Sequence, residues 1–368
     1  MVVFGRVYRG DSGQSKGAKP RTICRRLTDQ HQRRGKVEHI DLSDPYAAAV
    51  DLGATNLRVA LGLRDGTFIA KKSEPTGTVS GDLGISRQII RMTRSIQREN
   101  HVPERNFCGI GIGSIGPLNP IKGGIDRPAN ISQYGFIPLV GPLHSEFGVP
   151  VKLLNDCSAA VIGEKQVGAG TGEDNLVYIT ISSGIGAGVY VDGHLLSGKD
   201  GNAHEVGHMV IDSGGKLLCG CGRRGHWEAY CSGRNIPDYA RLFLQNSGIE
   251  AFKKTLLYEQ SSGELSNLSA KTIYECAAQG DELCTRFLEE VGRLNAIGFA
   301  NVANLYDPAL ITVGGSVALN NSALTLEPVI AQIGDYVFNR PPKIQVTPLG
   351  EDIVLVGALV VAFGFPDS

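Results

Sequence analysis

The sequence predicts an α/β protein with two lobes, and three observations support this prediction. The chain has 368 residues, whereas a single hydrophobic core stops growing at about 250 to 300 residues. Strand-like and helix-like segments alternate along it. In addition, "YAAAVDLGATNLRVALGLRDG" and "NLVYITISSGIGAGVYVDGHLLSG" share one pattern of strand, small turn, strand and Asp-Gly turn. Two related halves that each begin with such a hairpin would bring both hairpin tips to one central cleft.

The other elements follow in chain order from their residue patterns. Between the hairpins, "LGISRQIIRMTRSIQREN" has the apolar spacing of a helix, and "FCGIGIGSIGPLNP" indicates a buried strand that enters a tight turn. "CSAAVIGEKQVGAG" should form a helix that begins at or near Asp156. A long amphipathic helix is marked by Leu283, Phe287, Val291, Leu294 and Ile297. "ALITVGGSVALN" predicts a strand that ends in two glycines, and "IVLVGALVVAFGF" predicts a short buried helix or strand.

These elements divide the chain into three regions. Residues 1–45 carry ten Lys or Arg against five Asp or Glu and have neither strand nor helix periodicity, so we interpret them as a flexible basic arm. A disordered extension or an over-extended gene start explains this arm most simply, and nucleic-acid binding or targeting are the alternatives. We expect a small α/β lobe over 46–154 and a large α/β lobe over 155–349. Residues 350–368 should pack back on the small lobe.

The composition argues against several classes of partner. The 36 Lys and Arg nearly cancel the 37 Asp and Glu, so no global field attracts nucleic acid or an anionic membrane. The chain contains no run of about 18 apolar residues, and its first residues lack the apolar core of a secretion signal. We therefore expect a cytoplasmic protein that binds small molecules and keeps most of its eight cysteines reduced and buried.

The tip of the first hairpin has the residues of a phosphate site. A strand that ends in Asp leads into a turn whose N–H groups and hydroxyls can approach phosphate, while the Asp can hold a magnesium-bound water. The candidates are Asp51, Gly53, Thr55 and Asn56. Since similar turns also occur in ordinary hairpins, this tip alone is weak evidence.

The second tip strengthens the interpretation. Ser182, Ser183 and Gly184 repeat the small, hydroxyl-bearing chemistry in the other half of the chain. Neither tip contains the Gly-Lys-Ser/Thr of a P-loop, so that class of nucleotide site does not apply. Two opposed phosphate-binding hairpins suit an ATP site between two lobes.

Asn155 and Asp156 stand between a predicted strand and a predicted helix. A carboxylate in this position is commonly just an N-cap. In a phosphate cleft, Asp156 could instead accept the proton of a substrate hydroxyl as its oxygen attacks the γ-phosphoryl group.

The spacing of two cysteines and two histidines indicates a metal site. In "CGCGRRGHWE", Cys219 and Cys221 are too close for the common Cys-x-x-Cys redox motif, and a structural disulfide is rare in the cytosol. With His208 upstream and His226 downstream, the set has the four nitrogen and sulfur ligands of a tetrahedral structural zinc with no open position. The alternative is a pair of buried thiols beside surface histidines.

Such a zinc would also fix two carboxylates. Glu228 follows the cysteine loop directly, and Glu205 lies three residues before His208 in "HEVGH". Carboxylates held toward a cleft can accept hydrogen bonds from pairs of sugar hydroxyls, so this pair suits a polyhydroxylated substrate. The simplest alternative is a surface salt-bridge role for each glutamate.

Taken together, these motifs resemble the ROK family of sugar kinases and sugar-responsive repressors, a branch of the actin-like ATPase (ribonuclease H-like) fold. The resemblance covers about residues 46–368 and is carried by "DLGATNLRVAL", "LLNDCSAAVIGE", "ITISSGIGAGVYVDGHLLSG", "NAHEVGHMVID", "CGCGRRGHWEAYCSG" and "ITVGGSV". It implies that Asp156 is the general base and that Gly314 and Gly315 lie near the adenosine. The sugar contacts that it implies are Asn130, Asn155, Glu205, His208 and Glu228. It also implies a homodimer.

Two positions depart from the family pattern. His226 stands where the family has a third zinc cysteine, which keeps four ligands but can alter metal affinity, and Ser182 stands where Gly is more usual. Repressor members of the family carry a winged helix-turn-helix ahead of the kinase core. The 45-residue arm is too short and too unpatterned for that domain.

The resemblance implies a kinase that uses ATP and Mg²⁺, with a structural Zn²⁺, to phosphorylate the 6-hydroxyl of a hexose. Glucose is the expected substrate, as in a glucokinase, and N-acetylmannosamine and N-acetylglucosamine are the alternatives. A non-catalytic sugar sensor is one rival, although it would not need a phosphate site together with a base. An actin-like or chaperone-like ATPase is the second, and it would leave the zinc loop and the ring of Asn and Glu without a purpose.

Overall fold

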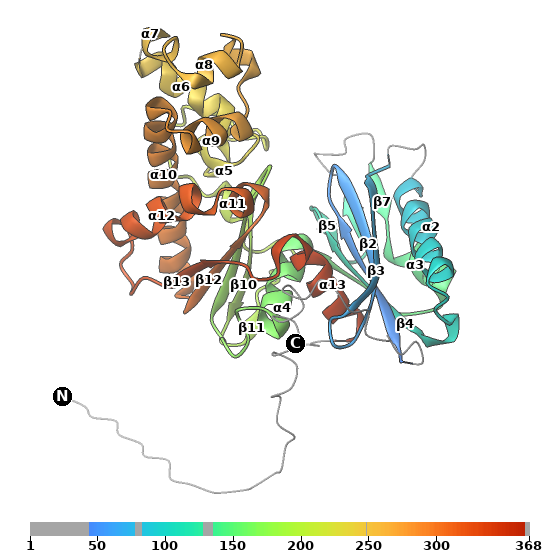
Figure 1. Cartoon of the computed structure of the whole chain (residues 1–368). Helices are drawn as coiled ribbons and strands as arrows, with labels where there is room; N and C mark the ends of the chain where they lie inside the picture. Colours follow the sequence, from blue (N-terminus) through green and yellow to red (C-terminus); the bar gives the residue numbers. More distant parts are fainter. Residues whose placement is uncertain (1–43, 78–82, 128–134, 248, 365–368) are drawn as a thin grey trace, which may run out of the picture. The chain divides into compact units, whose positions relative to one another are not determined.

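The computed structural model describes residues 44–77, 83–127, 135–247 and 249–364 (Figure 1). Most of the arm expected over 1–45 therefore lies outside the described residues, and so does Asn130. Within the described ranges, none of the helices combines the length and the apolar character needed to cross a bilayer.

The first of two five-stranded sheets begins with the first predicted hairpin. In spatial order its strands are β3 (Phe68–Pro75), β2 (Asn56–Leu63), β1 (Tyr46–Leu52), β4 (Phe107–Ser114) and β8 (Val151–Asn155). Strand β1 pairs antiparallel with β2 and parallel with β4, and β4 pairs parallel with β8. The hairpin register sets Asp51 opposite Arg58.

The second sheet repeats this topology. Its spatial order is β11 (His194–Leu195), β10 (Ile185–Val191), β9 (Leu176–Ile181), β12 (Leu310–Gly314) and β13 (Lys343–Val346). Strand β9 pairs antiparallel with β10 and parallel with β12, and β12 pairs parallel with β13. The pairing directions match those of the first sheet, which confirms the two related halves expected from the hairpins. A smaller sheet contains β5 (Leu118–Asn119), β6 (Gly124–Asp126) and β7 (Phe136–Pro138).

Helices connect and cover these strands. The α-helices are α2 (Gly84–Glu99), α3 (Val140–Phe147), α4 (Asp156–Val167), α5 (Glu228–Cys231), α6 (Ile236–Ser247), α7 (Ile249–Phe252), α8 (Leu256–Gln260), α9 (Ala270–Ala278), α10 (Glu282–Tyr306), α11 (Ser316–Asn320), α12 (Ser322–Gln332) and α13 (Ile353–Ala362). The 3₁₀ turns are η1 (Glu104–Asn106), η3 (Val206–His208), η4 (Leu265–Asn267), η5 (Ile333–Asp335) and η6 (Gly350–Asp352). Helix α10 is the long amphipathic helix expected from its apolar spacing, and the Asp281 side chain caps it by accepting from two backbone N–H groups.

Strand β1 is buried on both faces because its side chains alternate between two cores. One face packs with α2 residues at helical spacing, and this core includes Tyr46, Ala48, Val50, Leu52, Ile85, Ile89, Met92 and Ile96. The other face packs with α13, and this core includes Ala47, Ala49, Leu355, Ala358 and Leu359. The small alanines allow a helix to approach the strand closely.

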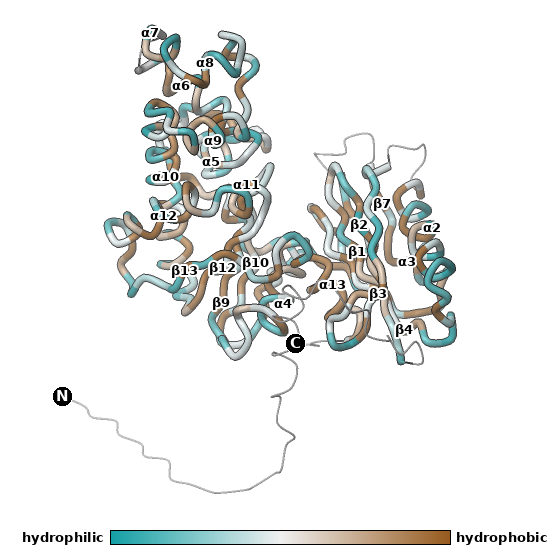
Figure 2. The backbone as a smooth tube through the Cα atoms, in the orientation of Figure 1, coloured by the Kyte–Doolittle hydropathy of each residue, from teal (hydrophilic) through white to brown (hydrophobic). Residues whose placement is uncertain are grey.

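The closing apolar segment, for which the sequence allowed a helix or a strand, forms helix α13. This helix is largely hydrophobic along its length (Figure 2). It packs against α4 as well as β1 and β4. Gly357 faces the Ala159 carbonyl of α4 so closely that a Cβ would collide with it, and Gly111 of β4 faces the Ala358 carbonyl in the same way. Helix α13 can therefore approach both α4 and β4 closely, because a glycine stands at each contact.

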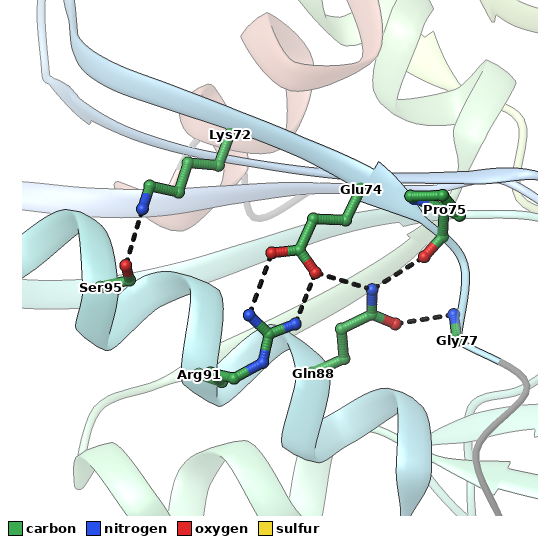
Figure 3. A network of polar contacts seen from close by, with 7 residues as sticks. All are labelled: Lys72, Glu74, Pro75, Gly77, Gln88, Arg91 and Ser95. Atoms are coloured by element: carbon green, nitrogen blue, oxygen red, sulfur yellow. Dashed lines mark hydrogen bonds and ion pairs between the residues drawn. The ribbon is translucent and has the colours of Figure 1, made fainter.

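A polar network joins β3 to α2 on the first sheet (Figure 3). Arg91 forms a two-point ion pair with Glu74, with an Nη1–Oε1 distance of 3.0 Å. The Gln88 side chain donates to the Pro75 carbonyl at 2.9 Å and accepts from the Gly77 N–H at 2.8 Å. Gln88 thus fixes the backbone that leaves the end of β3.

Candidate active site

Asp156 is the first residue of α4 and directly follows strand β8. The preceding Asn155 caps the helix, because its Oδ1 accepts hydrogen bonds from the N–H groups of Cys157 at 2.9 Å and Ser158 at 3.3 Å. Asp156 Oδ1 accepts from the Cys157 N–H at 2.8 Å. The capping role therefore belongs mainly to Asn155, whose side chain accepts from two N–H groups of the first turn.

The surroundings of Asp156 make it a stronger base than an ordinary aspartate. Its pKa is raised to about 6, first by burial and then by the negative charge of Asp51, with a smaller contribution from Glu205. Such a group is still ionised at neutral pH and accepts a proton more readily than a carboxylate of normal pKa. These interactions also place three predicted site residues, Asp51, Asp156 and Glu205, in one electrostatic cluster.

The tip of the first hairpin carries an ion pair. Asp51 Oδ2 accepts from Arg58 Nε at 2.8 Å and also contacts Arg58 Nη2. Burial raises the pKa of Asp51, and Arg58 opposes that rise. Arg58 Nη1 lies 3.8 Å from Oδ1 of Asp352, at the start of α13. In the described structure, Oδ1 of Asp51 has no hydrogen-bond partner and is available to a hydrated cation.

Thr76 stabilises the tip of the first hairpin through two hydrogen bonds to the backbone of the tip. Its Oγ1 donates to the Gly53 carbonyl at 2.7 Å, and its N–H donates to the Thr55 carbonyl at 2.8 Å. The Gly53 N–H closes the turn on the Asn56 carbonyl at 3.0 Å. Thr76 is buried, and its neighbours are those that Gln88 fixes from α2. The Thr55 and Asn56 side chains are exposed.

The second tip is held by residues from other parts of the chain. The Ser182 N–H donates to the Gly184 carbonyl at 2.9 Å, and the Ser182 carbonyl accepts from the Gly233 N–H at 2.7 Å. Ser182 Oγ lies 3.1 Å from Ser316 Oγ, next to the two glycines that end β12. Of these, Gly315 has a φ of +86° and lies against the end of β9, where a Cβ would collide with the Ile181 carbonyl.

The structure therefore brings Ser182, Gly184, Gly314 and Gly315 to one place. Ser183 lies in the same tip and is exposed.

Four residues form the predicted metal cluster. Ligand atoms of His208, Cys219, Cys221 and His226 all lie within 4.8 Å of one another. Cys219 Sγ is 3.7 Å from His208 Nδ1, and Cys221 Sγ is 3.3 Å from His226 Nδ1. Ligands around a tetrahedral zinc are about 3.3–3.8 Å apart, as bond lengths of about 2.0–2.3 Å require. Burial, with a further effect of His208, lowers the pKa of His226 and favours the neutral imidazole that a metal needs. The donor set thus fits zinc.

Two carboxylates flank this cluster. Glu205 Oε2 lies 3.8 Å from His208 Nε2, on the side of the ring opposite the nitrogen that faces Cys219. Glu228 Oε1 lies 3.5 Å from Cys219 Sγ, and its Oε2 accepts from the Ile185 N–H at 2.9 Å. Burial raises the pKa of Glu205, and the charge of Glu228 raises it further. Both glutamates therefore lie beside the metal cluster and are not isolated surface charges.

Two residues that hold the tip of the first hairpin were missed in the sequence. Arg58 could have been found from the hairpin register, because it faces Asp51 across the strand pair. Thr76 has no local signal, since its contacts depend on where the chain passes after β3. The predicted sugar contact Asn130 lies outside the described residues.

Comparison with known proteins identifies the family of the chain. The model of the ROK family matches residues 47–363. A glucokinase from Pyrobaculum calidifontis is 34% identical over 319 residues, which cover 87% of this chain and 95% of that protein. An N-acetylmannosamine kinase from Escherichia coli is 30% identical over 323 residues, which cover 86% of this chain and 98% of that protein.

A solved structure shows the same architecture. The crystal structure of a ROK family glucokinase from Streptomyces griseus, in complex with glucose and AMPPNP, superposes with a TM-score of 0.71 at 29% identity. The match covers 86% of this chain and 99% of that one. The actin-like α/β fold expected from the motifs is thereby confirmed.

Proposed function

The chain belongs to the ROK family, and from that premise we propose that it is a glucokinase, which uses Mg²⁺ and ATP to phosphorylate the 6-hydroxyl of glucose. The observation that carries this proposal is the state of Asp156. Its pKa is raised to about 6 by burial and by Asp51, and the adjacent Asn155 takes the main capping role at the start of α4. A phosphoryl transfer to an alcohol needs a base of this kind beside the acceptor hydroxyl.

The residues of the site divide the work between binding and proton transfer. Asp156 accepts the proton of the 6-hydroxyl, and Asn155 keeps Asp156 in place by capping α4. Asn130, Asn155, Glu205, His208 and Glu228 bind the sugar hydroxyls. The two hairpin tips bind the phosphates through backbone N–H groups, and Gly314 and Gly315 let the adenosine approach β12. Catalysis is then largely a matter of positioning.

Two metals complete the site in this proposal. Magnesium would be held near Asp51 and would supply positive charge to the phosphates. Zinc, when bound by His208, Cys219, Cys221 and His226, would supply a closed structural crosslink. The reduced thiols that zinc requires and the supply of ATP support a cytoplasmic reaction.

The choice of sugar is the finer part of the proposal. Glucose is favoured because the glucokinase relative is more similar than the N-acetylmannosamine kinase relative, at 34% against 30% identity. N-acetylmannosamine is the second candidate because an N-acetylmannosamine kinase is also among the relatives. A homodimer is also proposed from the family, and a monomer mass in sedimentation equilibrium would contradict it.

The test is sugar-dependent ADP release with Mg²⁺ and ATP. Glucose, mannose, fructose, N-acetylglucosamine and N-acetylmannosamine should be compared with a control that contains no sugar, and Asp156→Asn is the matched inactive variant. We expect a strong response to glucose alone. A response to another sugar corrects the substrate, and equal ADP release without sugar points to an ATPase. No response to any sugar, with sugar binding still measurable, supports a sensor.

A further inference from the structure

Glu228 contacts both the metal loop and the start of strand β10. It is the first residue of α5, immediately after the metal loop, and it is only partly exposed. Its Oε1 faces Cys219 Sγ at 3.5 Å, and its Oε2 accepts the Ile185 N–H at 2.9 Å. Ile185 is the first residue of β10, directly after the second hairpin tip. One carboxylate thus contacts both the metal loop and the backbone of the hairpin assigned to the nucleotide.

The carboxylate of Glu228 also lies close to Gly184 of the hairpin tip. A Cβ on Gly184 would lie 2.7 Å from Glu228 Oε2, so a larger residue there would displace the carboxylate from its present position. The segment after α5 reaches the other end of the tip, where the Gly233 N–H donates to the Ser182 carbonyl at 2.7 Å. The Asn235 side chain donates to the Glu228 carbonyl at 3.0 Å and steadies the segment.

We propose that Glu228 is a positioning residue for the nucleotide hairpin as well as a sugar contact, so that sugar and nucleotide affinities are coupled through this one carboxylate. The proposal rests on the function proposed above. A sugar hydroxyl that donates to Glu228 immobilises the side chain that orders Ile185 and the tip. The second ligand then meets a hairpin that is already ordered, which is positive coupling. By linkage, the nucleotide strengthens sugar binding by the same factor.

Glu205 provides the matched control. It is also expected to contact the sugar and lies beside the same histidine, with 3.8 Å between its Oε2 and His208 Nε2. Its side chain is 55% exposed, and within the described residues it makes no hydrogen bond to the second hairpin. Loss of Glu205 should therefore affect the sugar and leave the nucleotide alone.

The experiment measures binding without turnover. Calorimetric titrations with MgADP in the absence of sugar, and with glucose in the absence of nucleotide, should be made for the unaltered protein, Glu228→Ala, Glu228→Gln and Glu205→Ala. Glu228→Ala should weaken MgADP about tenfold, the effect of one net hydrogen bond, and should weaken glucose as well. Glu228→Gln should weaken glucose but keep MgADP within about twofold, because an amide oxygen still accepts from Ile185. Glu205→Ala should weaken glucose only.

Unchanged MgADP affinity in Glu228→Ala overturns the proposal, and so does equal weakening in Glu205→Ala. A second variant keeps the test independent of the folding of Glu228→Ala. Gly184→Ala places a methyl group against Glu228 Oε2 and should weaken glucose without any nucleotide present, although Gly184 is assigned no sugar contact. Unchanged glucose affinity in Gly184→Ala contradicts the coupling. If glucose is the wrong sugar, the unaltered protein fails to bind it, and the MgADP comparison of Glu228→Ala with Glu228→Gln still decides the positioning role.

Discussion

The two hairpins have the same topology but are held in different ways. The first tip carries its own charge, since Asp51 pairs with Arg58 in the adjacent strand, and Thr76, directly after β3, completes its support. The second tip has no charged residue and is held by Glu228, Gly233 and Ser316, which lie far along the chain. A repeat that is visible in the sequence thus keeps the arrangement of strands, whereas the residues that hold each tip come from different parts of the chain.

The largest effect should come from Asp156, the proposed base, whose pKa is raised by Asp51 at the first hairpin. Asp156→Asn should lower kcat by about 10²- to 10⁴-fold and leave the glucose Kd nearly unchanged, because the amide keeps its place but accepts no proton. In the unaltered protein, activity should be lost as pH falls through about 6, where Asp156 becomes protonated.

The pH dependence of activity should also distinguish the effects of the two hairpins. Removing the charge of Asp51 with Asp51→Asn should shift the acidic limb to lower pH, since that charge raises the pKa of Asp156. Ser182→Ala in the second tip should leave the limb in place. A shift of equal size in both variants would show that the difference in charge between the tips has no influence on the base.

Loss of the metal should destabilise the second hairpin more than the first, because Glu228 follows the metal loop and accepts the Ile185 N–H. Metal analysis should find about one zinc per chain, and Cys219→Ser should lower both the melting temperature and the sugar affinity, because the loop that presents Glu228 loses its crosslink. Hydrogen exchange should increase at Ile185 before it increases at Asp51. Metal-free protein with normal sugar binding would contradict the zinc assignment.

Arg58 should contribute to stability at the first tip. Arg58→Met leaves the carboxylate of Asp51 unpaired and should cost about 1–3 kcal/mol in the free energy of unfolding, measured by urea titration. The double variant Asp51→Asn with Arg58→Met should recover part of that loss, because the unpaired charge is then absent. No recovery would mean that the two residues act independently.

The smallest effect should be at Thr76. Thr76→Val removes the hydroxyl that binds the Gly53 carbonyl and should cost about 1 kcal/mol and raise the KM for ATP, whereas Thr76→Ser should behave normally. The exposed Arg91–Glu74 pair in Figure 3 serves as a control from the same sheet. Arg91→Ala should change stability by less than about 1 kcal/mol and leave the KM for ATP unchanged.

Local features of the site could be predicted from the sequence because they depend on short stretches of chain. The strand and turn pattern located both hairpins, the step from strand to helix located Asp156, and the ligand types and spacing located the cluster around Cys219. The Glu228 to Ile185 contact could not be predicted, since it joins a side chain to a backbone N–H that is 43 residues away. Such contacts depend on how whole elements pack, which periodicity does not record.

The close packing of α13 has a consequence for how the protein is made. The alanine face of β1, at Ala47 and Ala49, is covered by Leu355, Ala358 and Leu359. During synthesis, that face of the first sheet therefore stays uncovered until residues 353–362 have left the ribosome. Contacts between such distant segments form slowly, and the uncovered sheet is open to aggregation in the meantime. Ribosome-bound chains that stop before α13 should bind chaperones that full-length chains release.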